Sequence, residues 1–313
     1  MKKQTKMTGD GFSTFHPLVN FLYFVSVIGF GMFFLHPACL LISLLGSISY
    51  SIYLRGRKAI SFQLLYLLPM LIVMALVNPL FNHEGATILT YFRTGNPLTL
   101  EAIYYGLASA TMIVSSICWF SCFNEIITSD KLIYLFGRII PAFSLILSMA
   151  MRFVPRFNEQ IKNIADAQRS IGRDVSSGSV FQRAKNGLLI LSAMATWALE
   201  NSIETSNSMK SRGYGIKGRT SFSIYRIENR DKRALLFLLM TGGIVFFGAL
   251  QNALYYRYYP TLKVQLGSTT YAVLIVYAAL VVFPLAYNLW ENLKYKKWRE
   301  NPSVDMMEQF ANR

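Results

Sequence analysis

The chain has 313 residues, of which 53% are hydrophobic and 14% aromatic, while only 15% carry a charged side chain. A soluble globular domain has roughly 25% charged residues, so this composition excludes an ordinary soluble domain. The formal net charge is +15. In so apolar a chain, a basic surplus marks the cytoplasmic loops of a membrane protein and not a nucleic-acid interface. The composition predicts an all-α, polytopic helical membrane protein.

Apolar runs predict six membrane spans, since about 20 apolar residues cross the hydrocarbon core. His36-Pro37 divides the first long run into two, because proline disfavours a continuous helix at that point. Pro69 is expected to kink the third span. The stretches 82–100 and 255–268 suit outer or interfacial connections, the second because it is rich in tyrosine. In chain order, the predicted spans are 18–35, 38–54, 62–81, 101–122, 233–254 and 269–290.

The distribution of basic residues orients these spans. Residues 151–232 carry fourteen Lys or Arg against seven Asp or Glu, so we expect this stretch and both termini to be cytoplasmic. A full crossing by residues 132–151 would break that rule, and Gly137, Arg138 and Pro141 interrupt them. We therefore expect 132–151 to form a helix at the inner face, continuing into the charged segment. The predicted domains are 1–122 (four spans), 123–232 (a cytoplasmic helical region), 233–293 (two spans) and 294–313 (a cytoplasmic tail).

The central segment 151–215 reads as two long helices that each build towards a Ser-x-Gly element. The first has one apolar stripe and ends at Gly172, as helices commonly do at glycine. The second starts near Val180; its part 187–199 is apolar nearly all round and must be buried in protein or lipid. Its last part is polar and ends with Arg212, where a cation complements the helix dipole. The stripe residues are Val154, Phe157, Ile161, Ile164 and Ile171.

Two interpretations of this segment follow from its residues. A basic amphipathic helix beside a membrane span is commonly an interfacial helix, whose cations face lipid head groups. Alternatively, Arg212 projects from a helix tip into a partner, where its planar guanidinium engages a carboxylate through two hydrogen bonds. The duplicated Ser-x-Gly element favours the second interpretation.

Residues 130–216 resemble the T component of energy-coupling factor transporters, the EcfT/CbiQ family. Arg152-Phe153-Val154-Pro155 matches that family's arginine–apolar–proline element. In the family a first helix then ends in Ala-Gln-x-x-Arg-Gly and a second in Arg-Gly-Tyr. The second motif is matched by Ser211-Arg212-Gly213-Tyr214-Gly215, and His16-Pro17-Leu18 resembles the family's entry motif. The first motif departs from the pattern, because Ile171 replaces its arginine; the charge has moved to Arg169 or Arg173, or this contact is apolar.

The resemblance implies a passive subunit of an importer in the plasma membrane of a prokaryote. Two ABC ATPase subunits, A and A′, would bind ATP and magnesium and move the coupling helices. These would move a separate membrane-embedded S component, which carries a vitamin or a metal ion such as cobalt or nickel. The implied ATPase-coupling residues are Arg169, Ser170, Ile171, Gly172, Ser211, Arg212 and Gly213, with Arg152, Pro155, Tyr214 and Gly215 shaping the helices.

Two other functions were weighed against this one. A membrane-embedded lipid or prenyl transferase would need paired aspartates for magnesium, but Asp166 and Asp174 are separated by a glycine helix stop. A conventional ABC permease would bind its substrate itself and would carry a single, different coupling motif. The chain has no phosphate-binding loop of the GxxxxGK[ST] type. We therefore expect no catalytic residue, metal site or cofactor in this chain, and partners limited to ATPases, an S component and lipid.

Overall fold

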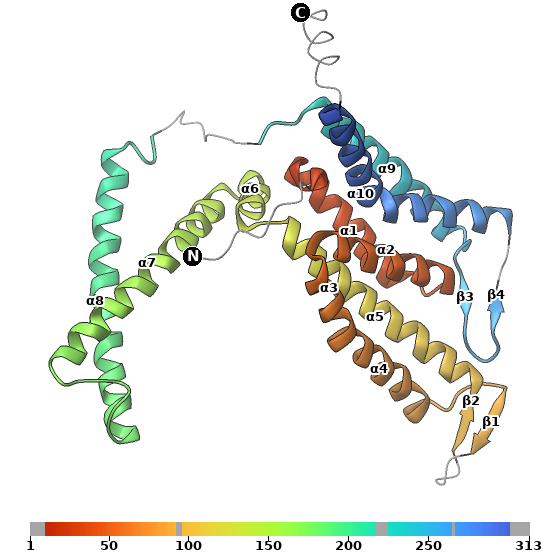
Figure 1. Cartoon of the computed structure of the whole chain (residues 1–313), viewed down its shortest axis with the longest axis horizontal. Coiled ribbons are helices and arrows are strands. Elements are labelled where there is room, and N and C mark those ends of the chain that lie inside the picture. The colour runs from red at the N-terminus through yellow and green to blue at the C-terminus, as the bar shows by residue number, and fades with distance from the viewer. Residues whose placement is uncertain (1–9, 92–95, 217–224, 265–266, 301–313) are drawn as a thin grey trace, which may run out of the picture. The chain divides into compact units, whose positions relative to one another are not determined.

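The computed structural model describes residues 10–91, 96–216, 225–264 and 267–300. It is mostly helical (Figure 1), which confirms the predicted fold class. The chain divides into two compact units. We call Met1–Lys131 with Tyr225–Arg313 the membrane unit, and Leu132–Ile224 the central unit. The four-part division expected from the sequence stays a prediction.

The membrane unit contains the helices that are long and apolar enough to cross a bilayer. Five candidate spans occur in the described residues: α2, α3 to α4 taken as one, α5, α9 and α10. The first predicted span corresponds to α1, which is apolar but has only 17 residues. The bounds are α1 (Pro17–Phe33), α2 (Pro37–Arg55), α3 (Arg57–Phe62), η2 (Gln63–Leu67), α4 (Leu68–Phe81), α5 (Leu100–Ile126), α9 (Asn229–Leu250) and α10 (Ser268–Glu300).

The first two helices begin with the same His-Pro cap. Nδ1 of His16 accepts a hydrogen bond from the Leu18 N–H at 3.2 Å, and Nδ1 of His36 accepts one from the Ala38 N–H at 3.3 Å. The proline that follows each histidine occupies the first helical turn, where its missing N–H costs nothing. The predicted break at His36-Pro37 is therefore a helix start.

Aromatic side chains fill the centre of the membrane unit. Tyr23 packs edge-on against Phe12 and Phe24, with ring centroids 5.2 Å apart in each pair. The Tyr23 hydroxyl donates to the carbonyl of Val281 in α10 at 3.0 Å. The indole N–H of Trp119 in α5 donates to the hydroxyl of Ser43 in α2 at 3.1 Å. The polar atoms of Tyr23 and Trp119 thus each have a partner, as those of buried Tyr and Trp usually do, and these contacts join α1 to α10 and α5 to α2.

The connections predicted as irregular loops contain two short hairpins. Strand β1 (Ile88–Tyr91) pairs antiparallel with β2 (Pro97–Thr99), and β3 (Tyr256–Arg257) pairs with β4 (Lys263–Val264). The hairpins lie at the same end of the unit (Figure 1), where the Ala86 N–H donates to the Pro260 carbonyl at 3.0 Å. The tyrosine-rich connection is therefore an ordered cap on the helices.

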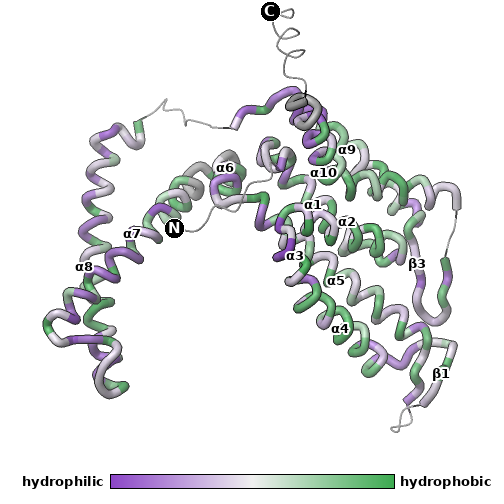
Figure 2. Tube along the Cα trace, in the orientation of Figure 1, coloured by the Kyte–Doolittle hydropathy of each residue, from purple (hydrophilic) through white to green (hydrophobic). Residues whose placement is uncertain are grey.

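In the central unit the predicted helix 132–151 is interrupted at Ile140, and its second part continues into the charged segment as predicted. Helix α6 (Ser129–Ile139) ends, and α7 (Pro141–Ser170) starts after a break at Ile140. Proline disfavours helical backbone in the residue before it, which explains the break. Neither helix is a candidate span. Helix α8 (Val180–Ser211) follows, and α7 and α8 carry long hydrophilic stretches, unlike the helices of the membrane unit (Figure 2).

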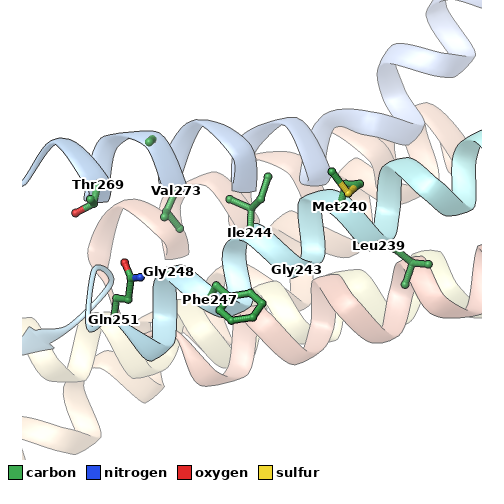
Figure 3. A pocket seen from close by; sticks show the side chains of 10 residues that line it. Leu239, Met240, Gly243, Ile244, Phe247, Gly248, Gln251, Thr269 and Val273 are labelled. Carbon is green, nitrogen blue, oxygen red and sulfur yellow. The ribbon is translucent and has the colours of Figure 1, made fainter.

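A shallow hollow of about 470 Å³ lies between α9 and α10 (Figure 3). Its lining is mostly apolar, with Leu239, Ile244 and Phe247 from α9 and Val273 from α10. Both helices are candidate spans, so we expect hydrocarbon to fill the hollow. It brings no set of charged groups together and is not the candidate site.

Helix α4 packs against α5 through a glycine. A Cβ atom added at Gly106 would lie 2.7 Å from the carbonyl oxygen of Ala75 and 3.2 Å from Cδ of Pro79. Because backbone atoms on α4 cannot move aside separately, Gly106→Leu should push the two helices apart and destabilise the protein by about 1–3 kcal/mol. Thermal unfolding in detergent measures the change.

Gly243→Leu on α9 is the matched control, because a Cβ there meets no atom within 4 Å. Its melting temperature should equal that of the unaltered protein. Equal melting temperatures for the two variants would contradict the close contact at Gly106.

Candidate functional site

The two Ser-x-Gly elements form the same backbone structure. At the end of α7, the Arg173 N–H donates to the Gln168 carbonyl at 3.0 Å, and the Gly172 N–H donates to the Arg169 carbonyl at 3.0 Å. Gly172 has a φ of +79°, a conformation that a residue with a Cβ rarely adopts. This pair of hydrogen bonds is the Schellman motif, which satisfies carbonyls left open at a helix end.

Helix α8 ends in the same way. The Tyr214 N–H donates to the Met209 carbonyl at 3.0 Å, the Gly213 N–H donates to the Lys210 carbonyl at 2.9 Å, and Gly213 has a φ of +77°. Ile171 and Arg212 are the C-cap residues of α7 and α8, with φ, ψ of −100°, 17° and −85°, 10°. The sequence duplication is therefore a duplicated helix end, and Ile171 and Arg212 are its equivalent positions.

Both C-cap side chains are exposed in the central unit. Ile171 is 63% exposed. Arg212, Ser170 and Ser211 are exposed as well. At these equivalent positions the surface of the central unit thus has an apolar side chain, Ile171, and a cation, Arg212.

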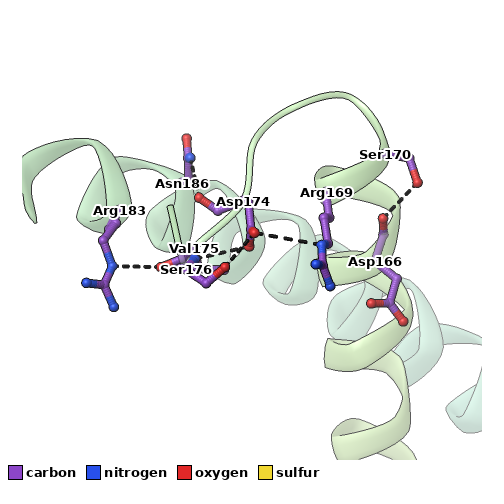
Figure 4. A network of polar contacts seen from close by, with 8 residues as sticks. All are labelled: Asp166, Arg169, Ser170, Asp174, Val175, Ser176, Arg183 and Asn186. Carbon is purple, nitrogen blue, oxygen red and sulfur yellow. Dashed lines mark hydrogen bonds and ion pairs between the residues drawn. The ribbon is translucent and has the colours of Figure 1, made fainter. Parts of the chain in front are cut away.

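The loop between α7 and α8 is ordered around Asp174 (Figure 4). Its carboxylate accepts hydrogen bonds from the backbone N–H of Ser176 at 3.0 Å and from the Ser176 hydroxyl at 2.5 Å. The Nε of Arg169 lies 3.7 Å from Oδ2 of Asp174. The Asn186 amide donates to the Asp174 carbonyl at 2.9 Å, and Arg183 Nε donates to the Val175 carbonyl at 2.9 Å. Both flanking helices therefore hold the loop, and Arg169 is directed towards it.

An aromatic contact holds α7 and α8 against each other. Phe157 of α7 meets Trp197 of α8 edge to face, with ring centroids 5.5 Å apart. The guanidinium of Arg156 lies over the same indole at 5.6 Å, a cation–π distance. Trp197 is thus the contact point of the two helices.

A polar hollow of about 460 Å³ lies between the same two helices. Helix α7 contributes Arg152, Phe153 and Arg156, and α8 contributes Glu204 and Arg212 among others. Three arginines and one carboxylate therefore share one concave surface. The structure brings Arg152 and Arg212 together here, although sixty positions separate them in the sequence.

The remaining candidate residues have local roles. Pro155 lies inside α7 one turn from Arg152, and Gly215 has a φ of +92° after the end of α8. Sequence reasoning missed Arg156, Asp174, Trp197 and Glu204. The helical spacing of Asn201, Glu204, Thr205, Ser208 and Arg212 was a usable signal, since such steps align side chains along one helix face.

The apolar part 187–199 of α8 is only partly buried within the chain. Ile190 and Met194 are buried, whereas Leu188, Leu191 and Leu199 are more than 60% exposed. This chain alone therefore covers only part of these apolar side chains, and burial of the rest in protein or lipid stays a prediction. An apolar surface of this kind commonly marks a contact with a partner or a membrane.

Comparison with known families agrees with this geometry. The model of the CbiQ family, described as cobalt transport protein, matches residues 15–222, which is more than half of the chain and includes both helix ends. The chain belongs to this family. The resemblance identified from the motifs is confirmed, and with it the expectation of a non-catalytic membrane subunit of a transporter.

Individual relatives carry the name energy-coupling factor transporter transmembrane protein EcfT. The relative from Brevibacillus brevis is 30% identical over 200 residues, covering 59% of this chain and 75% of that protein. The relative from Bacillus subtilis is 24% identical over 209 residues, covering 64% and 76%. The relative from Lactobacillus helveticus is 38% identical over 109 residues, covering 33% and 38%, so this match spans well under half of that protein's length.

The hydrogen bonds at Asp174 make a pH-dependent prediction. The Ser176 hydroxyl and N–H, followed by the charge of Arg169, lower the pKa of Asp174 below its ordinary value of 3.8. The loop contacts are therefore complete above pH 3.8 and are lost as the pH falls through the lowered pKa. Ser176→Ala should raise the pKa of Asp174 towards 3.8, as measured by carbon-13 NMR titration of its carboxyl group.

Ser177→Ala in the same loop is the control and should leave that pKa unchanged. An equal pKa in the two variants would show that the Ser176 hydroxyl does not hold the carboxylate.

Proposed function

We propose that this chain is the transmembrane coupling subunit of an energy-coupling factor importer. It transmits the motion of two ATPase subunits, A and A′, to a separate S component that carries a vitamin or metal ion. The observation that carries the proposal is the pair of equivalent helix ends, which present Ile171 and Arg212 from one compact unit. ATP and magnesium bind to the ATPases, and this chain binds no cofactor.

Arg212 is the charged contact with an ATPase. Arg212 is the C-cap residue that follows the 32-residue helix α8, and the Schellman hydrogen bonds hold the backbone at this helix end. A guanidinium suits this role because it engages a carboxylate in fixed geometry. Ser211 and Gly213 form the same contact, with Tyr214 and Gly215 ending the helix.

Ile171 is the apolar contact with the other ATPase. At the end of α7, Ile171 occupies the position equivalent to Arg212. Arg169, one of the two arginines that could supply the missing charge there, is directed to Asp174. An exposed isoleucine at a C-cap gains free energy when a partner removes it from water. Two unlike ends, one apolar and one cationic, suit two non-identical ATPase subunits.

The membrane unit is the part that lies in the plasma membrane of a prokaryote. Arg55 and Glu125 form an ion pair with a 3.0 Å contact at the ends of α2 and α5. The basic central unit follows from that same end of α5, so we assign this end and both termini to the cytoplasm by the positive-inside rule. Lipid covers the exposed apolar faces of the spans. The exposed leucines of α8 are the proposed contact with the S component.

The rival functions find less support. The Asp174 carboxylate, required by a transferase, is occupied by Ser176 and Arg169 in the loop. Asp166 lies on α7 and accepts a hydrogen bond from Ser170 through its backbone carbonyl. Copurification distinguishes a coupling subunit from a transferase: a coupling subunit brings down two ATPase chains and a small membrane protein, whereas a transferase brings down neither.

The role of Arg212 is tested by Arg212→Ala and Arg212→Glu. Both should leave expression intact and reduce uptake about 30-fold or more, because removing one partner of a buried ion pair costs ~2 kcal/mol or more. Glu should be the worse, since it repels the partner carboxylate. Uptake into cells and copurification of the ATPases are measured together.

Lys210→Ala is the matched control, because Lys210 is an exposed cation on the same helical turn and does not line the polar hollow. It should keep normal uptake. Wild-type uptake and ATPase assembly in both Arg212 variants would overturn the assignment of Arg212.

The role of Ile171 is tested by Ile171→Asp against Ile171→Leu. The aspartate places a charge in an apolar contact and should abolish assembly with one ATPase, whereas leucine keeps the apolar area and should preserve it. Subunit stoichiometry of the purified complex gives the readout. Full assembly of the Ile171→Asp variant would show that this helix end makes no apolar contact.

A further inference from the structure

One short stretch of the N-terminus contacts both points at which the chain passes between its two units. The chain leaves the membrane unit after Lys131 and returns to it at Tyr225. We name the stretch Asp10–His16 the N-terminal clasp. It consists of the 3₁₀ turn η1 (Gly11–Thr14) and the cap of α1. All of the contacts described below lie within the membrane unit.

Lys131 fastens the clasp to the exit point. Its Nζ donates to the Ser13 carbonyl at 2.6 Å and to the Ile126 carbonyl at 3.0 Å. Ile126 is the last residue of α5, so one ammonium group satisfies an open helix-end carbonyl and a carbonyl of the clasp. In the amide orientation that satisfies both of its groups, Asn20 accepts from Lys131 at 3.3 Å and donates to the Phe12 carbonyl at 3.0 Å.

The burial of Lys131 indicates a specific role. Its exposed fraction is 8%, and lysine is rarely this buried unless it is paired. Burial lowers its pKa, while the nearby Asp10 opposes the change. The Lys131 side chain is thus held in the interior by the carbonyls to which it donates.

Asp231 fastens the clasp to the return point. Its Oδ1 accepts from the His16 N–H at 3.1 Å, and its Oδ2 accepts from the Glu228 N–H at 3.0 Å. Asp231 is in the first turn of α9 and is buried. Both of its oxygens are therefore used, one for the clasp and one for the chain segment that enters α9.

Arg230 adds a second contact at the return point. Its Nη2 donates to the Thr14 carbonyl at 3.2 Å, and its guanidinium lies over the Phe15 ring at 4.6 Å. The Tyr225 ring meets the His16 ring edge to face at 6.5 Å. The return point is thus held over several residues.

Asn288 of α10 also anchors the clasp. Asn288 accepts from the Phe12 N–H at 3.0 Å and donates to the Asp10 carboxylate at 2.5 Å. The Phe12 ring is completely buried among the central aromatic side chains. The clasp therefore cannot follow a movement at the exit point or the return point alone unless the central aromatic side chains move too.

We propose that the N-terminal clasp holds the exit and the return of the central unit at one fixed point, so that force on the central unit reaches α5 and α9 together. Lys131 and Asp231 are its positioning residues. The inference rests on the proposed function, in which the ATPases move the central unit. A hinge absorbs motion at a few residues of a connection; fastening both connections to one packed segment removes two such hinges.

The connection itself is tested without any partner, by amide hydrogen exchange of the full chain in detergent. Lys131→Met removes the exit contact but is expected to speed exchange in residues 225–231 as well as in the clasp, since the clasp joins the two. Lys232→Met, an exposed lysine next to Asp231, is the control and should change neither. Faster exchange confined to residues 126–131, or no change, would overturn the proposal.

A second variant guards against loss of folding. Asp231→Asn keeps the shape of the side chain, but its NH₂ group cannot accept a hydrogen bond. It should speed exchange at the exit, residues 126–131, which it does not touch. Unchanged exchange in residues 126–131 of the Asp231→Asn variant would also overturn the proposal.

The consequence for coupling is tested in the assembled transporter. Lys131→Met and Asp231→Asn should keep ATPase assembly and ATP hydrolysis, while substrate uptake per ATP falls about fivefold. Lys131→Arg, which retains donors, should restore uptake. Equal losses of assembly, hydrolysis and uptake would indicate a merely structural role, and unchanged uptake per ATP would contradict the coupling role.

Failure of the proposed function can be distinguished from failure of the clasp proposal. If the unaltered chain brings down no ATPase, the proposed function fails, while the exchange experiments still test the clasp.

Discussion

The closing of a helix by glycine is the constraint on which the central unit depends. The last carbonyls of any helix lack partners within it, and the chain satisfies them at α7 and α8 with the same two hydrogen bonds. Gly172 and Gly213 allow these bonds because both adopt positive φ. The residue before each glycine is thereby held with its side chain outside the helix. Ile171 and Arg212 are exposed for this backbone reason, whatever their chemistry.

The central unit needs a firm attachment as well as a firm tip. A rigid helix end transmits force only when the far end of the same body is held. Within the membrane unit, the N-terminal clasp joins the exit and the return of the chain, through a buried lysine at the exit and a buried aspartate at the return. Lys131 donates to two backbone carbonyls and Asp231 accepts from two backbone N–H groups, and backbone atoms have no rotamers to change. The two ends of the central unit thus use the same device, since each is set by hydrogen bonds to the main chain.

Local patterns were readable from the sequence, and contacts across long separations were not. The His-Pro starts, the glycine ends and most spans follow from rules that involve neighbouring residues. The hairpin of Tyr256–Arg257 with Lys263–Val264 was missed because two-residue strands show no alternation. The clasp joins residues far apart in the sequence, such as Ser13 with Lys131, 118 positions apart, and His16 with Asp231, 215 positions apart, and no periodicity reports such pairs. The polar hollow depends on where α7 meets α8, and the contact of Phe157 with Trp197 joins residues 40 positions apart.

The unlike chemistry of the two ends follows from the loop that joins the helices. Asp174 draws Arg169 towards the loop, so the last turn of α7 does not present that cation as α8 presents Arg212. Ile171 carries no charge, so it does not compete with Arg169 for the Asp174 carboxylate that orders the loop. The first helix end therefore gains rigidity from its ionic contacts and keeps an apolar tip, whereas the second has a cationic tip beside the polar hollow.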